Sequence, residues 1–330
     1  MNKNNQITSP VLFLCFNRPD KTQRVFECIR RARPAKLYVA ADAPREGRAD
    51  DVVSCQQVRE IVQKVDWPCE THYLFHEKNL GCTLAGKTAW DWIFSQEEDM
   101  IFLEDDGLVS DSFFPYCQEL LNKYRNDSRI AYIGAVNFGP KYGDASYFFT
   151  KISVSTYAMA TWKRAYDLYE YDLESYEETR NTEDFLSNFD SKLEKDVYLR
   201  FFDKYVNQLK GGFRLNTYDL QMVYFTLKHH LLSIYPNVNL VTNIGFDYDG
   251  SNTVVDPNSE EAKAHVREKY EIADLIHPAT VGFDKEFEQK MFQNRFLNDQ
   301  PLWKASLRHY VIDAKILVPV KKMVKTLLHR

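Results

Sequence analysis

The chain has 330 residues, of which 44% are hydrophobic, 27% charged and 14% aromatic. This length allows a substantial buried core, in one large domain or two smaller ones. The 22 Phe and 20 Tyr residues exclude a disordered chain. A formal net charge of −5 gives no electrostatic reason to expect a nucleic-acid partner, and we predict none.

The first ten residues, MNKNNQITSP, lack the apolar segment of a signal peptide. No run approaches the roughly 18 apolar residues of a membrane-spanning helix, so we expect a cytoplasmic protein. The six cysteines fall within the first 117 residues and form neither CxxC pairs nor zinc-ligand spacings. We therefore expect reduced thiols, although an even number also permits three disulfides.

Strand and helix patterns alternate through the first third of the chain. Apolar runs predict strands at residues 11–16, 37–41, 70–75 and 100–103, and amphipathic periodicity predicts helices at residues 21–32, 50–65 and 83–96. This alternation favours an α/β fold with a mainly parallel sheet, which binds ligands beyond the carboxyl ends of its strands. Asn17, Asp42, Asn79 and Asp106 follow those ends, so we expect them along one rim.

The middle of the chain is less regular. Residues 147–159 are predicted to be rich in β-structure and residues 236–245 to form a strand, whereas residues 162–168, 192–210 and 218–230 have helical patterns. Residues 246–259 form a loop rich in Asp, Asn, Gly and Ser. From about residue 260 onward we predict a helical extension.

Three adjacent carboxylates, Glu104, Asp105 and Asp106, follow the apolar run at residues 100–103. Carboxylates at the end of a buried strand cannot all be buried without a cation, so the pattern favours a metal site. Mg²⁺ and Mn²⁺ take oxygen ligands and often share them with phosphates of a substrate, and one of these ions is the expected cofactor. The alternative is a solvated acidic turn.

Seven segments of the chain match, in order, a known group of enzymes. They are PVLFLCFNRPD (10–20), LYVAADAPREGR (37–48), EKNLGC (77–82), LEDDGLVSDSFFPYCQELL (103–121), ATWKRAY (160–166), YDLQM (218–222) and IYPNVNLVTNIGF (234–246). On these motifs the chain resembles nucleotide-diphospho-sugar glycosyltransferases of the GT-A fold. The resemblance is to the bacterial hemolytic-protein HlpA-like family in particular, and more distantly to N-acetylglucosaminyltransferase I.

The resemblance implies a GT-A fold whose central sheet is flanked by helices. Residues 1–140 would form the half that binds the nucleotide sugar, and residues 141–259 the half that binds the acceptor. Residues 260–330 would form the helical C-terminal extension. The implied substrates are a UDP-sugar donor and a glycan acceptor.

The resemblance also implies a role for each residue near the donor. Phe16, Asn17 and Arg18 would lie beside the nucleotide. Asp42 would accept a hydrogen bond from the base, and an acid matched to an imide N–H suits uracil. A plain turn carboxylate is the alternative for Asp42.

Asn79 and Gly81 would touch the ribose or the phosphates, with Gly81 allowing a close backbone approach; a simple helix-entry turn is the alternative. Asp106 would bind the metal directly. Asp105 and Glu104 would orient the metal's waters or the ribose hydroxyls.

Asp219 would be the catalytic base that takes a proton from the acceptor hydroxyl in an inverting transfer. It precedes a predicted helix, so the alternative is an N-terminal residue that stabilises the helix dipole, and the two roles are compatible. Trp162 would line the sugar pocket on the donor side, or else belong to the core.

The chain departs from its relatives at three places. Residues 155–159 (STYAM) replace a stretch rich in Trp and Gly, and Met222 stands where a Trp is common. A His that relatives often have near Asn252 is missing, which leaves the metal with few protein ligands. The changes at residues 155–159 and at Met222 are expected to reshape the sugar or acceptor pocket.

The C-terminal tail, residues 303–330, has seven Lys and Arg residues against one acid, a local charge of +6. Interleaved apolar residues predict a basic amphipathic helix that would attach the protein to the anionic inner face of the cytoplasmic membrane. Packing on the domain or on a partner is the alternative.

These observations favour a metal-dependent, inverting glycosyltransferase that acts on a hydroxyl of a surface glycan or of its lipid-linked precursor. Two alternatives remain. A nucleotidyltransferase that forms sugar nucleotides uses a related sheet, although it normally begins with a Gly-rich phosphate loop that residues 17–20 (NRPD) do not provide. A catalytically silent carbohydrate-binding protein could also retain the fold.

Overall fold

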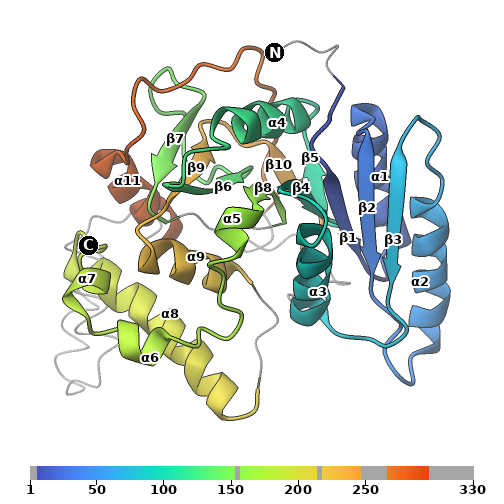
Figure 1. Ribbon diagram of the computed structural model, residues 1–330, viewed down its shortest axis with the longest axis horizontal. Coiled ribbons are helices and arrows are strands. Elements are labelled where there is room, and N and C mark those ends of the chain that lie inside the picture. The colour runs from blue at the N-terminus through green and yellow to red at the C-terminus, as the bar shows by residue number, and fades with distance from the viewer. Residues whose placement is uncertain (1–5, 153–156, 214–217, 247–265, 297–330) are drawn as a thin grey trace, which may run out of the picture.

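A computed structural model describes residues 6–152, 157–213, 218–246 and 266–296 (Figure 1). The strands are β1 (Val11–Cys15), β2 (Lys36–Ala41), β3 (Glu70–Phe75), β4 (Asp99–Glu104), β5 (Gly107–Val109), β6 (Ile130–Gly134), β7 (Tyr147–Thr150), β8 (Ala158–Trp162), β9 (Leu232–Pro236) and β10 (Val241–Asn243). The helices are α1 (Pro19–Ala32), α2 (Ala49–Val62), α3 (Cys82–Phe94), α4 (Phe113–Lys123), α5 (Lys163–Tyr166), α6 (Tyr176–Thr179), α7 (Glu183–Leu186), α8 (Lys192–Lys210), α9 (Asp219–Lys228) and α11 (Lys285–Phe296).

Eight strands form one central sheet in the order β3-β2-β1-β4-β8-β6-β9-β7. β3, β2, β1 and β4 are parallel, and β9 is parallel to β6, whereas β8 and β7 are antiparallel to their neighbours. Six strands therefore end at the same edge of the sheet. This confirms the predicted α/β fold with a mainly parallel sheet, and both predicted halves of the catalytic domain contribute strands to it.

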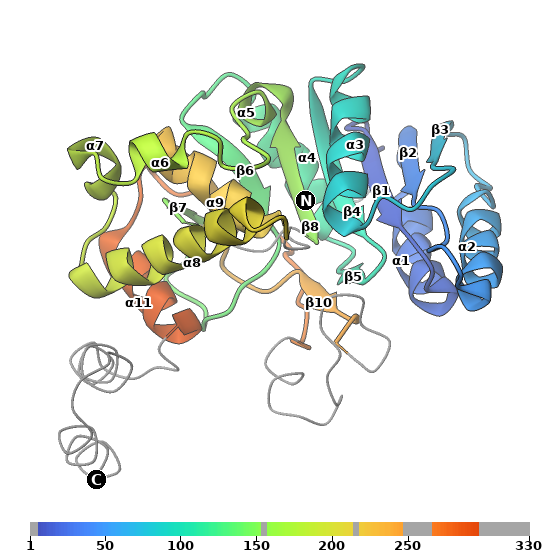
Figure 2. The same cartoon turned by 90° about the horizontal axis from the view of Figure 1, so that it is seen from below.

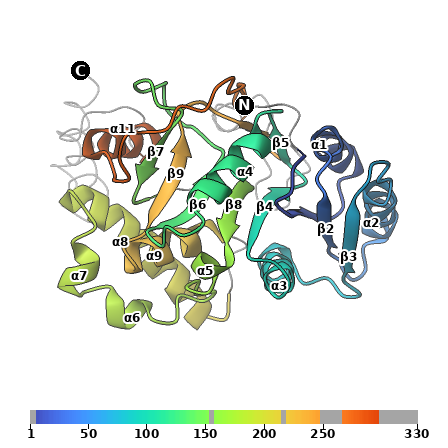
Figure 3. The same ribbon diagram turned by 45° about the horizontal axis from the view of Figure 1, so that its top comes forward.

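Helices cover both faces of the sheet because its central strands are apolar on both faces. In β1, Val11 and Phe13 pack with α1, α2 and α4, whereas Leu12 and Leu14 pack with α3 and α9 on the opposite face. Figure 3 shows α1 and α2 on one side of β1–β3 and α3 on the other. A third apolar cluster joins α6, α7, α8, α9 and α11, which lie together at the left of Figure 1.

The second half of the chain differs from the prediction at several elements. Residues 147–159 were expected to form one β-rich stretch, but β7 and β8 lie at separate positions in the sheet. The strand expected at residues 236–245 is two elements, the end of β9 and the short β10, and β10 pairs with β5 in a separate two-stranded ribbon (Figure 2). The predicted helical extension is wrong for residues 266–284, which contain no helix, while α11 follows them.

All six cysteines fall within the described residues and none is paired in a disulfide, as predicted. Across the described ranges, no helix is both long and apolar enough to cross a bilayer. The basic tail at residues 303–330 and the loop near Asn252 lie outside the described residues. Membrane attachment through the tail therefore stays a prediction.

Candidate active site

The loops that follow β1, β2, β3 and β4 meet at one rim of the sheet, as the parallel order requires. The backbone N–H of Phe16, just after β1, donates to Asp105 Oδ2 over 3.2 Å. The side chain of Asn79, which follows β3, donates to Asp42 Oδ2 over 3.0 Å. The rim predicted from the sequence therefore forms, and we call it the acidic rim.

Arg18 lies between the two aspartates at the end of β4. Its Nη1 atom is 3.3 Å from Asp106 Oδ2 and 3.9 Å from Asp105 Oδ1. The side chain of Arg18 is 10% exposed, that of Asp105 11% and that of Asp106 16%, so water screens the charges of the cluster poorly. Lys21, which is buried in the first turn of α1, adds a second positive charge. Burial raises the pKa of both aspartates, and the charge of Lys21 opposes that rise.

Burial favours the protonated form of the three carboxyl groups at the end of β4. Burial raises the pKa of Asp105 to about 6, against the lowering effect of the Arg18 guanidinium. Burial also raises the pKa of Asp106, and it raises that of Glu104 well above its ordinary range, with further contributions from the charges of Asp106 and Asp219. Four carboxylates face two nearby cations, so a bound divalent cation would restore the charge balance.

Asp106 provides one suitable ligand atom for such a cation. Its Oδ1 atom is buried and accepts no hydrogen bond from any described residue, which is costly unless a ligand pairs with it. No three His, Cys, Asp or Glu side chains in the described ranges converge as a ligand set. The residues present thus fit a metal ion that takes one carboxylate from the protein and most of its other oxygens from a substrate and water.

Gly245 lies against the carboxylate of Asp106, and no role was predicted for it from the sequence. A Cβ atom at this position would lie 2.3 Å from Asp106 Oδ2 and 3.0 Å from its Cγ, so only glycine fits. The neighbouring Ile244 donates its backbone N–H to the carbonyl of Asp106 over 2.8 Å, and Asn243 Oδ1 accepts from Gly245 N over 2.7 Å. The motif at residues 234–246 contained this glycine, but its contact with Asp106 could not be predicted because the two residues lie far apart in the sequence.

Asp42 has a different role from the one predicted. It is 4% exposed, and its two oxygens accept hydrogen bonds from the backbone N–H groups of Ala43, Leu80 and Gly81 and from Asn79 Nδ2, at 2.8–3.1 Å. These bonds use the acceptor capacity of the carboxylate. The prediction that Asp42 reads a uracil base is therefore wrong, and its alternative of a turn carboxylate fits, because the group fixes the loop after β3.

The other predicted donor-side residues also have partners at the acidic rim. Asn17 Nδ2 donates to Asp51 Oδ1 over 2.7 Å, and Asn79 Nδ2 also donates to the carbonyl of Ala43 over 2.7 Å. Gly81 has φ of +75°, a conformation that favours glycine, directly before α3. Its N–H points to Asp42, so its backbone is part of the loop's own hydrogen-bond network.

Asp219 is the first residue of α9 and is partly buried. The preceding ring, Tyr218, packs 6.3 Å from the ring of Phe102 in β4, two residues before Glu104. The negative charge of Asp219 helps to raise the pKa of Glu104, which places the two carboxylates near one another. The N-cap residue of α9 is Tyr218, so Asp219 occupies the first helical position rather than the capping position.

Trp162 does not join the acidic rim. It pairs in the sheet with Asp99, the first residue of β4, whereas the acidic triplet lies at the other end of that strand. The Trp162 side chain is 2% exposed, and its indole N–H donates to the carbonyl of Leu121 over 3.3 Å. The prediction that it lines the sugar pocket is wrong, and the core alternative is right, because the antiparallel direction of β8 takes its last residue to the opposite edge.

Comparison of the sequence with protein-family models and with curated proteins gives no match. Among solved structures, TarS 1–349 of S. aureus aligns at 12% identity over 50% of this chain, with a TM-score of 0.34, and the match spans 51% of that chain. A 4-diphosphocytidyl-2C-methyl-D-erythritol synthase from Anaerococcus prevotii aligns at 13% identity over 61% of this chain and 86% of its own, with a TM-score of 0.31.

A UDP-glucose pyrophosphorylase complexed with UDP-glucose aligns at 15% identity over 44% of this chain and 64% of its own, with a TM-score of 0.24. Each of these likenesses is slight. The activity of this chain therefore has to be argued from its own residues.

Proposed function

We propose that this chain is a metal-dependent, inverting glycosyltransferase that moves a sugar from a UDP-sugar donor to a hydroxyl of a surface glycan or its lipid-linked precursor. The observation that supports it most is the buried Oδ1 atom of Asp106, which accepts no hydrogen bond within the described part of the chain. It lies in a rim with an excess of carboxylates over cations. That arrangement suits a metal ion that arrives with a diphosphate.

On the donor side, Asp106 would hold Mn²⁺ or Mg²⁺, which neutralises the negative charge that builds on the leaving diphosphate. Arg18 now pairs with Asp106 and Asp105, and it is placed to turn toward the phosphates when the donor binds. Phe16, Asn17 and Asn79 would contact the nucleotide from the same rim. The choice of uridine depends on the family resemblance, because Asp42 is fully engaged with the protein itself.

On the acceptor side, Asp219 would accept the proton of the attacking hydroxyl. Asp219 is the first residue of α9, so it lies at the partly positive N-terminal end of that helix. The anionic Asp219 would then take the proton as the hydroxyl oxygen attacks the anomeric carbon opposite the diphosphate. Glu104, whose pKa burial raises well above its ordinary range, would remain protonated beside it and donate a hydrogen bond.

A nucleotide-sugar binding screen with and without Mn²⁺ tests the proposal. We expect UDP-sugars to raise the melting temperature only when Mn²⁺ is present, and Asp106→Asn to abolish this effect while the fold is kept, because the group lies at the edge of the sheet. Asp111→Asn is the matched control, since Asp111 is a mostly exposed aspartate five residues away that pairs with Arg31.

Unchanged Mn²⁺-dependent binding in Asp106→Asn would contradict the metal assignment. The reaction itself separates the alternatives: release of UDP from a UDP-sugar indicates glycosyl transfer or hydrolysis. Formation of pyrophosphate from UTP and a sugar 1-phosphate would instead identify a nucleotidyltransferase. Saccharide binding with neither reaction would identify the silent carbohydrate-binding protein.

A further inference from the structure

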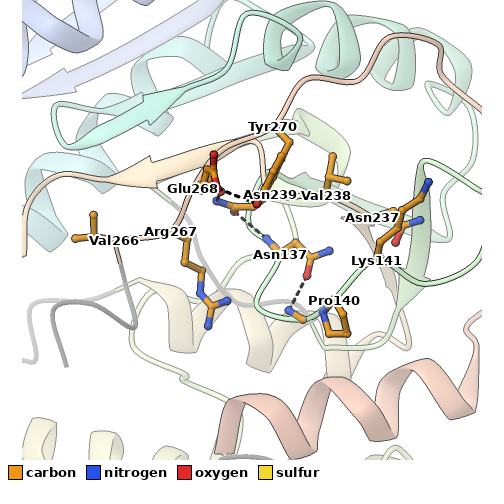
Figure 4. Close-up of a pocket in the computed structure, with 11 residues that line it drawn as sticks. Asn137, Pro140, Lys141, Asn237, Val238, Asn239, Val266, Arg267, Glu268 and Tyr270 are labelled. Atoms are coloured by element: carbon orange, nitrogen blue, oxygen red, sulfur yellow. Dashed lines mark hydrogen bonds between the residues drawn. The ribbon is translucent and has the colours of Figure 1, made fainter. Parts of the chain in front are cut away.

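A cavity opens at the same edge of the sheet as the acidic rim, where β6 and β9 end (Figure 4). Its volume is about 580 Å³, which falls in the range of sites that bind small ligands. Its walls come from three segments: residues 137–141 after β6, residues 237–239 after β9, and residues 266–270. None of the residues predicted to bind the donor lines this cavity, which we call the asparagine pocket.

Three buried asparagines build the floor of the asparagine pocket. Asn137 donates its side-chain amide to the carbonyl of Pro236 over 3.0 Å, and its backbone N–H to Asn239 Oδ1 over 3.0 Å. Asn239 donates to the carbonyl of Glu268 over 2.9 Å, and Asn237 accepts the N–H of Tyr142 over 2.6 Å. Because these amides are engaged by the backbone, they hold the three segments in a fixed shape before any ligand arrives.

The side chains around this floor are charged and aromatic. Lys141 is exposed, and its ammonium group makes no hydrogen bond or ion pair with any described residue. Arg267 is held in place by its Nη1 bond to the carbonyl of Phe138 over 2.9 Å and by stacking 5.2 Å from that ring. Tyr270 is 50% exposed and donates to Glu268. The lining therefore includes two cations, one carboxylate and a half-exposed aromatic ring, which favours an anionic, ring-containing ligand.

The asparagine pocket is joined directly to the acidic rim through β10. Asn239 lines the pocket, and Gly245, six residues later, lies against the carboxylate of Asp106. At about 3.3 Å per residue for extended chain, the two sites are at most roughly 20 Å apart along this strand. A chain of a few sugar units could thus occupy the pocket while its end reaches the acidic rim.

We propose that the asparagine pocket is an acceptor subsite for an oligosaccharide that bears a carboxylate or phosphate group. The acid group pairs with Lys141, with Arg267 adding positive charge, and a sugar ring packs on Tyr270. This assignment rests on the proposed glycosyltransferase function and names its acceptor class as an anionic glycan. In Figure 4, Asn137 lies between Arg267 and Lys141, and Tyr270 lies apart from both cations.

Calorimetric titration of the full chain with three probes tests this inference. The probes are a hyaluronan tetrasaccharide (carboxylate), mannose 6-phosphate (phosphate) and chitotetraose (neutral). We expect at least one acidic probe to bind, and Lys141→Gln to weaken that binding about tenfold or more, the scale of one lost charge-assisted hydrogen bond. Tyr270→Ala should weaken every probe that binds. Whichever acidic probe binds identifies the acid group.

Lys64→Gln is the matched control, because Lys64 is an exposed lysine beyond the end of α2. It should bind the probes as the unchanged chain does. Failure of both acidic probes to bind, or equal affinity in Lys141→Gln and the unchanged chain, would overturn the inference. Titration with UDP and Mn²⁺ in the same samples separates the two proposals. If the unchanged chain binds an acidic probe but not UDP, the glycosyltransferase proposal is rejected and the glycan pocket is kept. Lys141→Gln should bind UDP as the unchanged chain does.

Discussion

Two clusters in this protein each bring more carboxylates than cations together, four against two at the acidic rim and three against two beneath α11, yet they differ in what they can bind. At the acidic rim, Asp105 and Asp106 face Arg18, and one oxygen of Asp106 accepts no bond from the described residues. Beneath α11, Asp190 lies 3.5 Å from Lys151 and 3.2 Å from Lys285.

In the second cluster the charged groups are paired with one another and with the backbone. Glu288 of α11 accepts the backbone N–H of Lys151, and Glu194 accepts that of Asp190 over 2.8 Å. The cavity left between these groups is about 20 Å³, enough for one water molecule. A group of acidic residues alone therefore does not indicate a metal site. The acidic rim differs from the second cluster because it lies at the edge of the sheet and because Asp106 Oδ1 accepts no hydrogen bond from the described residues.

The largest effect is expected at the base. Asp219→Asn should lower kcat about 10²–10⁴-fold, because an amide cannot accept the proton of the acceptor hydroxyl, while the affinity for the donor changes only a few-fold. Steady-state kinetics and donor titration on the same sample measure the two quantities. Normal turnover would reduce Asp219 to a residue that stabilises the start of α9.

Asp42 provides a contrast within the acidic rim, since its carboxylate is fully paired. Asp42→Ala should destabilise the protein by about 3 kcal/mol, because it leaves several buried N–H groups of the loop after β3 without acceptors. Urea unfolding measures the change. Asp50→Ala, which removes an exposed aspartate that pairs with Arg48, should change stability by less than about 1 kcal/mol. Similar losses in both variants would refute the special role of Asp42.

The cluster beneath α11 should make stability depend on pH. Burial raises the pKa of Glu288 to about 7, although the charge of Lys151 opposes the rise. The folded state therefore keeps a proton that the unfolded chain releases, so stability falls as pH rises from about 4.5 to 7, by up to about 3 kcal/mol. Denaturant unfolding at pH 5 and pH 7.5 measures the difference. Glu288→Gln should remove the part that Glu288 contributes and leave the part that comes from the carboxyl groups of the acidic rim, whose pKa values are also raised.

Glu286→Gln is the matched control on the same helix, because Glu286 is exposed and pairs with Lys290. It should leave the pH dependence as it was. Mn²⁺-dependent nucleotide binding also distinguishes the two clusters. Glu288→Gln should keep this binding, whereas Asp106→Asn should lose it. If Glu288→Gln loses it as well, the division into a ligand site and a structural cluster is wrong.

The smallest effect concerns the fit of Gly245 against Asp106. Gly245→Ala places a methyl group 2.3 Å from the carboxylate, so β10 or the aspartate has to shift, at a cost of about 1–3 kcal/mol. We expect Mn²⁺-dependent UDP affinity, measured by calorimetry, to fall about tenfold. Gly282→Ala should have no effect, since no atom lies within 4 Å of the added group. Equal affinities in the two variants would show that the contact is not needed.

The sequence predicted the first half of the fold well because each element there has a local pattern. β1 to β4 are apolar runs separated by amphipathic helices, and the parallel order then places Asn17, Asp42, Asn79 and Asp106 on one rim. β5 and β10 have three residues each, too few to show a period, and they are stabilised by pairing across the chain. Such strands cannot be recognised from local sequence.

The roles of individual side chains were harder to predict than their positions. Asp42 was expected at the rim and lies there, but whether its oxygens face a ligand or the backbone depends on the path of the loop at residues 79–81. Trp162 was assigned to a pocket on the family resemblance and was predicted to begin a helix, whereas it ends the antiparallel strand β8 at the other edge of the sheet. Contacts between distant segments, rather than local chemistry, decide both cases.

The ribbon of β5 and β10 also sets the order in which the protein can assemble. Leu108 pairs with Thr242, 134 residues later in the chain (242 − 108), so this contact closes one of the longest loops in the fold. During synthesis at about 5–20 residues per second, Asp106 would leave the ribosome roughly 7 to 28 seconds before Gly245. The acidic rim is therefore completed late, and a nascent chain that already has β1 to β4 would still lack the wall that closes around Asp106.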